Sequence, residues 1–226
     1  MTEPEYASLV GLLDEVYEAT SQVVSGIDDD DDFDRPTRTE RWSVKDLLFH
    51  QMCDAQRALI VFTTSADGPA DTTAVSYWSS WRPGQPGADD HARYVSKAAA
   101  AYGSPSSLVA QWTETSRAAV RAARAHDGAA LVTTQGHVLT AADFTHTLAV
   151  EGVVHHLDLT LELPSPELPT DAYQLVVDVL TGLFGADLPP SWSVTEAILK
   201  GTGREPLDDA DRMALGEAAD RLPLFG

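Results

Sequence analysis

Apolar residues recur at spacings of three and four along most of the chain, which is the pattern of amphipathic helices. The first such segment runs from Tyr6 to Ile27 and the second from Ser43 to about Phe62. Further helices are predicted from near His91, from the Gly103-Ser104-Pro105 break to about His126, from Thr140 to Leu163, over 171–184 and over 194–200. We therefore expect a mainly α-helical protein.

Helix starts and one turn can be placed more closely. Ser43 with Asp46, Thr140 with Asp143, and Ser193 with Glu196 have the spacing of helix-capping pairs. Between two helices, the segment from Leu131 to Leu139 alternates weakly around Gln135-Gly136, which predicts a small β-hairpin or an extended crossover.

Four or five long helices with one weak β signal predict an antiparallel helical bundle, here a four-helix bundle, with sites where inward side chains of facing helices meet. Three prolines, at 164, 166 and 169, interrupt the pattern after Leu163. We expect residues 1–165 to form the bundle and residues 166–226 to form a small C-terminal helical extension packed on it.

Composition narrows the function. The net charge of −20 argues against nucleic-acid binding, which needs clustered Lys and Arg. No apolar run is long enough for a membrane span, the first residues are acidic rather than basic, and the single Cys53 suits a reducing compartment, so we expect a cytoplasmic protein. The aspartate-rich run over 28–34 is interpreted as a solvated connection, since it lacks the spaced ligands of an EF-hand.

A long loop is predicted from Thr63 to Asp90, rich in Gly, Pro, Ser and Asp. Loops of this length are usually functional or disordered, and the aromatic cluster of Tyr77, Trp78 and Trp81 favours a folded segment. These three residues are candidates for binding a cofactor under a lid. The alternative is that they only pin the loop to the body of the protein.

The helix from Thr140 to Leu163 carries a polar group on its inward face. At about 100° per residue, Glu151, His155 and Asp158 share one side of the helix. His50, with Asp54 one turn later, lies on the second helix, and the three donors His50, Glu151 and His155 would suit a tetrahedral metal ion with one open position. Spacing alone leaves a surface ion pair as the alternative.

Two motifs carry a resemblance to a known family. Thr39 to His50, TERWSVKDLLFH, resembles the W-[ST]-x-x-D-x-x-x-H opening of the DinB-like metalloprotein superfamily. Glu151 to Leu159, EGVVHHLDL, is similar to the E-x-x-x-H-x-x-D-L signature of its mycothiol-dependent maleylpyruvate isomerase branch. The late segments over 199–207 and 221–225 also resemble tails of actinobacterial members.

The resemblance implies metal ligands at His50, Glu151 and His155, with Zn²⁺ as the metal and mycothiol as the thiol cofactor. One departure concerns the turn before Glu151, where many members carry an arginine and this chain has Thr147, Leu148, Ala149 and Val150. The chain also looks short after Pro169 for the full C-terminal domain of the isomerase.

A three-ligand Zn²⁺ site leads to two enzyme hypotheses. In the first, which the resemblance favours, a mycothiol-dependent transferase or cis-trans isomerase acts on a small electrophilic substrate. In the second, zinc-bound hydroxide hydrolyses an ester or amide, with Asp54 or Asp158 as the catalytic base. Each aspartate is otherwise a candidate for orienting a ligand histidine. A third hypothesis is a bundle that binds metal or ligand without catalysis.

Other polar residues receive simpler interpretations. His156 lies about 100° round the helix from His155, so it is expected to pack rather than to bind metal. His91, His126 and His137 are expected to be solvated, and Cys53 to be a small buried residue rather than a nucleophile.

Overall fold

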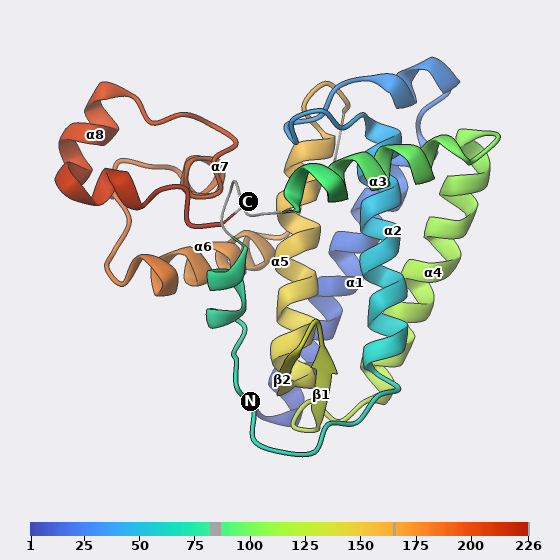
Figure 1. Ribbon diagram of the computed structural model, residues 1–226, viewed down its shortest axis with the longest axis horizontal. Coiled ribbons are helices and arrows are strands. Elements are labelled where there is room, and N and C mark those ends of the chain that lie inside the picture. Colours follow the sequence, from blue (N-terminus) through green and yellow to red (C-terminus); the bar gives the residue numbers. More distant parts are fainter. Residues whose placement is uncertain (82–86, 165, 226) are drawn as a thin grey trace.

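The computed structural model describes residues 1–81, 87–164 and 166–225 (Figure 1). Residues 82–86 of the long predicted loop, residue 165 at the predicted domain boundary, and residue 226 lie outside the described residues. The prediction of a mainly helical chain with one small hairpin is confirmed.

Four long helices form the bundle: α1 (Glu3–Ser25), α2 (Val44–Val61), α4 (Pro105–Ala125) and α5 (Ala141–Leu159). Helices α1 and α5 begin at the same end of the bundle at which α2 and α4 finish (Figure 1). Two contacts fix these directions: the Tyr6 hydroxyl donates to the Ala123 carbonyl at 2.9 Å, and the rings of Phe62 and Phe144 lie 5.5 Å apart. Consequently α2 and α5 pack against each other as antiparallel helices.

The predicted capping pairs set the starts of these helices. The Ser43 hydroxyl accepts a hydrogen bond from the Asp46 backbone, and the Asp46 side chain accepts one from the Ser43 backbone, so α2 opens with a complete capping box. Thr140 accepts a hydrogen bond from the Asp143 backbone in the same way at α5. Both helices that carry the metal-ligand candidates are therefore fixed in register from their first turn.

Helices α1 and α5 approach each other closely at Gly152. A Cβ atom built there would lie 2.6 Å from Val16 Cγ1, closer than a side chain tolerates. The absence of a side chain lets α5 lie against α1 immediately after Glu151, and so helps to determine where that carboxylate sits.

Shorter elements close the ends of the bundle. Helix α3 (Ala88–Ala100) crosses one end (Figure 1), and strands β1 (Leu131–Thr134) and β2 (His137–Thr140) form an antiparallel hairpin at the other. Gln135 and Gly136 both have positive φ, as the two-residue turn of a hairpin requires. The aspartate-rich run is more ordered than predicted, because its residues Asp30–Asp34 form a 3₁₀ turn, η1, that buries Phe33.

The C-terminal part contains α6 (Thr170–Phe184), α7 (Val194–Gly201), the short α8 (Asp209–Leu215) and the 3₁₀ turn η3 (Gly216–Arg221). Helix α6 packs on α5, and α7 packs on α6. The last residues then return toward the bundle, where Phe225 stacks on Trp78 of the 3₁₀ turn η2 (Ser76–Ser80) at a centroid distance of 4.5 Å. The sequence predicted α6 and α7 but missed α8.

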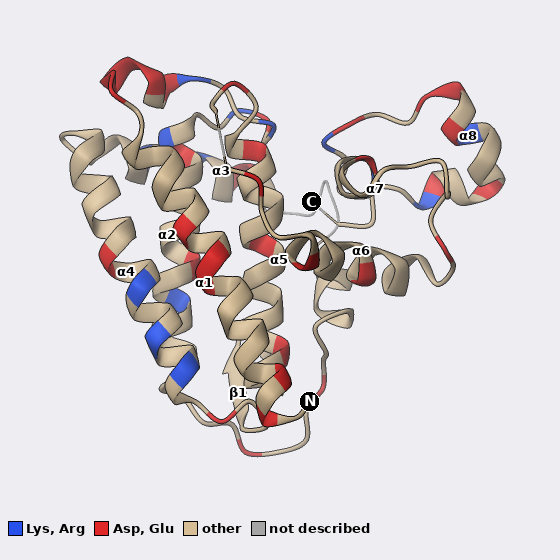
Figure 2. Ribbon diagram, turned by 180° about the vertical axis from the view of Figure 1, so that it is seen from behind, with Lys and Arg blue, Asp and Glu red and all other residues tan. Residues whose placement is uncertain are grey.

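Charge is unevenly distributed (Figure 2). Acidic residues are spread over α1, the loop before α2 and α8, whereas basic residues line the second half of α4. Two of those basic residues pair with α1, Arg124 with Asp14 at 2.5 Å and Arg117 with Glu18 at 3.8 Å. In the described part of the chain, no helix combines the length and hydrophobicity needed to cross a membrane.

Candidate metal centre

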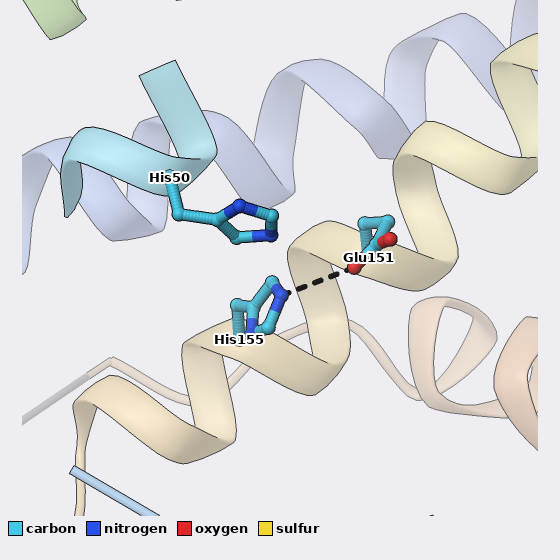
Figure 3. Close-up of side chains that lie close together, drawn as sticks. All are labelled: His50, Glu151 and His155. Atoms are coloured by element: carbon cyan, nitrogen blue, oxygen red, sulfur yellow. Dashed lines mark ion pairs between the residues drawn. The ribbon is translucent and has the colours of Figure 1, made fainter. Parts of the chain in front are cut away.

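Helices α2 and α5 bring His50, Glu151 and His155 together (Figure 3). Each residue offers one donor atom, and these atoms all lie within 4.8 Å of one another. His155 Nε2 is 3.1 Å from Glu151 Oε2, and the His50 and His155 rings meet edge to face with their centroids 4.9 Å apart. Within the described residues, this is the one group of three histidine, cysteine or acidic side chains with such a convergence.

Asp158 orients His155 through its other ring nitrogen. Its Oδ2 lies 3.0 Å from His155 Nδ1, and the carboxylate is fully buried. Because a hydrogen bond at Nδ1 directs the lone pair of Nε2 outward, this contact presents Nε2 toward His50 and Glu151.

The buried carboxylate of Asp158 is itself held from two sides. The Thr39 hydroxyl donates to Oδ2 at 2.9 Å, and Arg204 donates to both carboxylate oxygens at 3.2 to 3.3 Å. Arg38, the residue before Thr39, donates from its backbone N–H to the Asp158 carbonyl at 3.2 Å and from its guanidinium to the Leu157 carbonyl. The end of α5 is thus fixed by the segment before α2 and by the segment after α7.

His50 has a different environment. Trp42 and His91 flank its ring, with centroids at 4.9 and 5.6 Å. Asp54 Oδ2 lies 3.4 Å from His50 Nε2, yet this buried oxygen has no hydrogen-bond partner among the described residues. Asp54 therefore lies beside His50 Nε2, the nitrogen that faces the space between α2 and α5. It does not orient the His50 ring through Nδ1, as Asp158 orients His155.

The two histidines titrate in opposite directions. Burial lowers the pKa of His50 to about 3, and the nearby charge of His155 adds to this effect. Burial also acts to lower the pKa of His155, but its hydrogen bonds to Asp158 and Glu151 outweigh burial and raise the pKa to about 9. His50 is consequently neutral at pH 7, whereas His155 carries a proton that a metal ion would have to displace.

The surroundings of Asp54 and Asp158 shift the pKa values of these two carboxyl groups in opposite directions. Burial and the charge of Glu151 raise the pKa of Asp54 to about 8. Burial of Asp158 is outweighed by its hydrogen bond with His155 and the charge of Arg204, and its pKa falls to about 2. Asp158 is therefore a permanent anion that acts through His155, while Asp54 is the carboxyl group whose proton is exchangeable near neutral pH.

The predicted aromatic cluster lies at one side of this centre. Tyr77 is buried, and burial together with the charges of Glu151 and Asp54 raises its pKa, so its hydroxyl stays protonated. Trp78 is almost fully buried against Phe225, whereas 45% of Trp81 is exposed. Tyr77 and Trp78 are thus both buried, with Trp78 anchoring the loop, and Trp81 is the exposed member of the three.

Several residues near the centre were not predicted from the sequence. His91 is exposed as expected, but it stands beside His50 rather than apart from the site. Tyr17 of α1 is buried, and the charges of Asp54 and Glu151 add to burial in raising its pKa. Arg204 is separated from Asp158 by 46 residues, so no local pattern could have joined them.

Two residues keep the simpler roles predicted for them. His156 is buried and does not belong to the converging donor group. Cys53 is half-buried rather than fully buried as predicted, but burial still raises the pKa of its thiol to about 11, so the thiol is protonated at neutral pH and is a poor nucleophile.

The donor set fits a zinc-like divalent ion. Two imidazoles and one carboxylate are a typical three-ligand set for catalytic Zn²⁺, with ligand distances of roughly 2.0 to 2.2 Å and a fourth position left open. The hydrogen bond from His155 to a buried carboxylate is the support that such ligands usually have.

The chain is similar to proteins of one family. The family model described as the mycothiol maleylpyruvate isomerase N-terminal domain matches residues 13–160, which include both motifs. Among curated proteins, no sequence matches the chain significantly.

Two solved structures share the fold. The crystal structure of the mycothiol-dependent maleylpyruvate isomerase has a TM-score of 0.55 and 17% identity, over 81% of this chain and 72% of that one. The crystal structure of a histidine-to-alanine mutant of that enzyme has a TM-score of 0.54 and 16% identity, over the same shares. At this identity, the likeness establishes the fold of the chain and not its substrate.

Proposed function

The chain belongs to the family of the mycothiol maleylpyruvate isomerase N-terminal domain, and from this membership we propose that it is a metal-dependent enzyme that uses mycothiol as its cofactor. The reaction is transfer of the thiol to a small electrophilic substrate or cis-trans isomerisation of that substrate. His50, Glu151 and His155 are the metal ligands, and Zn²⁺ is the ion that their chemistry favours.

One observation carries this proposal: three donors from two facing helices converge, and one of them is oriented by a buried carboxylate. A surface ion pair between Glu151 and His155 would not require the His50 ring to lie 4.9 Å from the His155 ring, centroid to centroid. It would not require a buried Asp158 either. Burying an aspartate costs free energy unless the carboxylate is paired. The buried Asp158 bonded to His155 Nδ1 therefore supports a role for His155 as a metal ligand whose orientation must be fixed.

The bound ion and the cofactor would together supply a thiolate at neutral pH, and a thiolate isomerises a double bond by adding to it and then leaving. The residues of this chain hold and shape the place where this happens. His50 is kept neutral by burial and is ready to donate its lone pair. The hydroxyl of Tyr77 and the exposed face of Trp81 form the wall proposed to contact mycothiol, and Trp78 holds that wall in place.

Asp54 is the candidate acid-base group. It stands beside His50 Nε2, and its pKa of about 8, raised by burial and Glu151, allows it to accept or return a proton near neutral pH. Asp158 is excluded from direct proton transfer, because Arg204, Thr39 and His155 occupy its oxygens. In the alternative reaction, hydrolysis of an ester or amide, Asp54 would serve as the base.

The division of labour between the two parts of the chain is also a proposal. Residues 1–165 supply the three ligands, and residues 166–226 support them through Arg204 and Phe225. The C-terminal extension would then be part of the catalytic unit rather than an independent domain.

Substitution of Co²⁺ for the native ion gives a direct test. Titration with mycothiol should produce a sulfur-to-cobalt charge-transfer band, which should be absent from His50→Ala and Glu151→Ala. His126→Ala, which changes a histidine at the end of α4, should keep the band. If no thiol changes the spectrum while ester hydrolysis follows metal occupancy, the enzyme is a hydrolase; if neither occurs, the bundle binds metal or ligand without catalysis.

A further inference from the structure

Helices α1 and α2 face each other across the middle of the bundle, because each of them packs on both α4 and α5. One contact sets their relative level: the Thr20 hydroxyl lies 3.5 Å from Gln51 Oε1. The two helices run in opposite directions (Figure 1), so Tyr17, about one turn before Thr20, lies level with Asp54, about one turn after Gln51. A tyrosine of α1 is therefore placed at the level of the acidic residue beside the metal centre.

The ring of Tyr17 is held between α5 and α4. A Cβ atom built on Gly152 of α5 would lie 3.6 Å from Tyr17 Cε1, which is van der Waals contact, so the ring lies directly beside this residue. Trp112 of α4 meets the ring edge to face at a centroid distance of 5.2 Å. Trp112 Nε1 donates to Ser21 Oγ at 3.0 Å, and Ser21 Oγ donates to the Tyr17 carbonyl at 2.9 Å. Because Cε1 is bonded to the carbon that bears the hydroxyl, the hydroxyl lies near the turn of α5 that carries Glu151.

Two carboxylates act on this hydroxyl. Burial raises the pKa of Tyr17, and the charges of Asp54 and Glu151 raise it further. Tyr17 is therefore protonated at neutral pH and offers an uncharged hydrogen-bond donor to the space beside both acids. His50 adjoins the same space, because Asp54 Oδ2 is 3.4 Å from His50 Nε2.

Polar groups at this level of the bundle lack partners. The other buried tyrosine of α1, Tyr6, donates to a backbone carbonyl of α4 at 2.9 Å, whereas the Tyr17 hydroxyl makes no hydrogen bond with any residue that the structure describes. On α2, the buried atoms Gln51 Nε2 and Asp54 Oδ2 have no partner among the described residues either. Buried polar groups are nearly always hydrogen-bonded, so unpaired groups from two facing helices indicate a place where a ligand supplies the missing partner.

We propose that the Tyr17 hydroxyl donates a hydrogen bond to the anionic atom that binds among His50, Glu151 and His155, such as the thiolate sulfur of the cofactor. This inference rests on the proposed function and adds a catalytic residue from α1, a helix that carries none of the metal-ligand candidates. An anion that enters the centre meets the negative charges of Glu151 and Asp54. A neutral donor aimed at the same point offsets their repulsion and replaces the hydrogen bonds that the anion loses on leaving water.

Titration of the full, Co²⁺-substituted chain with azide tests the proposal, because this small anion binds an open metal position without requiring the thiol cofactor or turnover. Tyr17→Phe removes one oxygen atom and keeps the ring beside Gly152, so the cobalt content and the visible spectrum before azide is added should be unchanged. The affinity for azide should fall about tenfold, as expected for the loss of one hydrogen bond to an anion. The matched control is Tyr173→Phe, which removes the hydroxyl of a half-buried tyrosine of α6 and should leave the affinity unchanged.

Several results would overturn the assignment. One is an affinity for azide in Tyr17→Phe that stays within about twofold of the unmodified protein, which includes the case of no binding to either. Another is an equal loss in Tyr173→Phe. A third is a changed cobalt spectrum in Tyr17→Phe before azide is added, which would make Tyr17 a support for the ligand Glu151 rather than a donor to the bound anion. A missing mycothiol band combined with azide binding that depends on Tyr17 would reject the thiol function and retain this assignment, so the two failures are distinguishable.

Discussion

Arg204, beyond the end of α7, donates to the carboxylate of Asp158 at 3.2 Å, and both side chains are almost completely buried. Through this ion pair the C-terminal extension contacts the carboxylate that orients His155. The pair explains how a segment outside the four-helix bundle can influence the candidate metal centre without touching it.

Removing one partner of this ion pair should be costly. Arg204→Ala leaves the buried Asp158 carboxylate without its guanidinium partner and held only by His155 and Thr39, so the free energy of unfolding should fall by about 3 kcal/mol, and Zn²⁺ affinity should fall with it. Urea unfolding and metal titration measure the two effects. Arg212→Ala, which removes an exposed arginine from α8, should change neither. Unchanged stability in Arg204→Ala would mean that the ion pair does not hold the end of α5.

Metal binding should release a proton from His155. The pKa of this residue is raised to about 9, chiefly because its bonds to Asp158 and Glu151 outweigh burial, so it is protonated in the metal-free protein at pH 7. A coordinated imidazole is neutral, and affinity for Zn²⁺ should therefore rise with pH until it levels off near pH 9. Calorimetry in buffers of different ionisation enthalpy counts the protons released. An observed enthalpy that is independent of the buffer would contradict the assignment of His155 as a ligand.

The close approach of α1 and α5 gives a prediction with a control in the same helix pair. Gly152→Ala would push a methyl group against Val16, so it should destabilise the protein by about 1 to 3 kcal/mol and displace Glu151. Gly11→Ala in α1 meets no atom within 4 Å and should stabilise the helix by up to about 1 kcal/mol. Thermal unfolding of both variants decides the matter; a stabilised Gly152→Ala would show that α5 can move away from α1.

The residues of the centre that the sequence predicted share one property, which is that local spacing determines their position. Glu151, His155 and Asp158 share a helical face whatever the tertiary structure, and the side of α2 that carries His50 follows from its apolar positions. The structure joins His50, Glu151 and His155 in one group. Their role as ligands stays a prediction for the metal experiments.

The contributors that the sequence did not indicate depend on contacts between distant segments. Arg204 reaches Asp158 across 46 residues, and His91 meets His50 only because α3 crosses the end of the bundle. Helix α8 was missed for another reason, since its Asp208 and Asp211 capping box precedes a helix of only seven residues with little apolar periodicity. Phe33 likewise gave no sign that it would anchor the aspartate-rich run in the core.

The contact between Phe225 and Trp78 leads to a prediction about the wall of the site. The rings stack with their centroids 4.5 Å apart, and the adjacent Leu224 backbone donates to the Gly201 carbonyl at 2.8 Å, so the last residues are held by both α7 and the η2 loop. Phe225→Ala removes the ring against which Trp78 packs. The free energy of unfolding should fall by about 3 kcal/mol, because a large cavity forms between the loop and the extension.

The same change should loosen Tyr77, which adjoins Trp78 at a centroid distance of 5.3 Å. Mycothiol should then bind Co²⁺-substituted Phe225→Ala more weakly, while the ion itself is retained, because the three ligands come from α2 and α5. Met213→Ala, a change at an exposed side chain of α8, provides the control and should leave both affinities unchanged. If Phe225→Ala loses stability but binds mycothiol as before, the η2 loop only covers the core, and the cofactor contacts must be sought on another side of the centre.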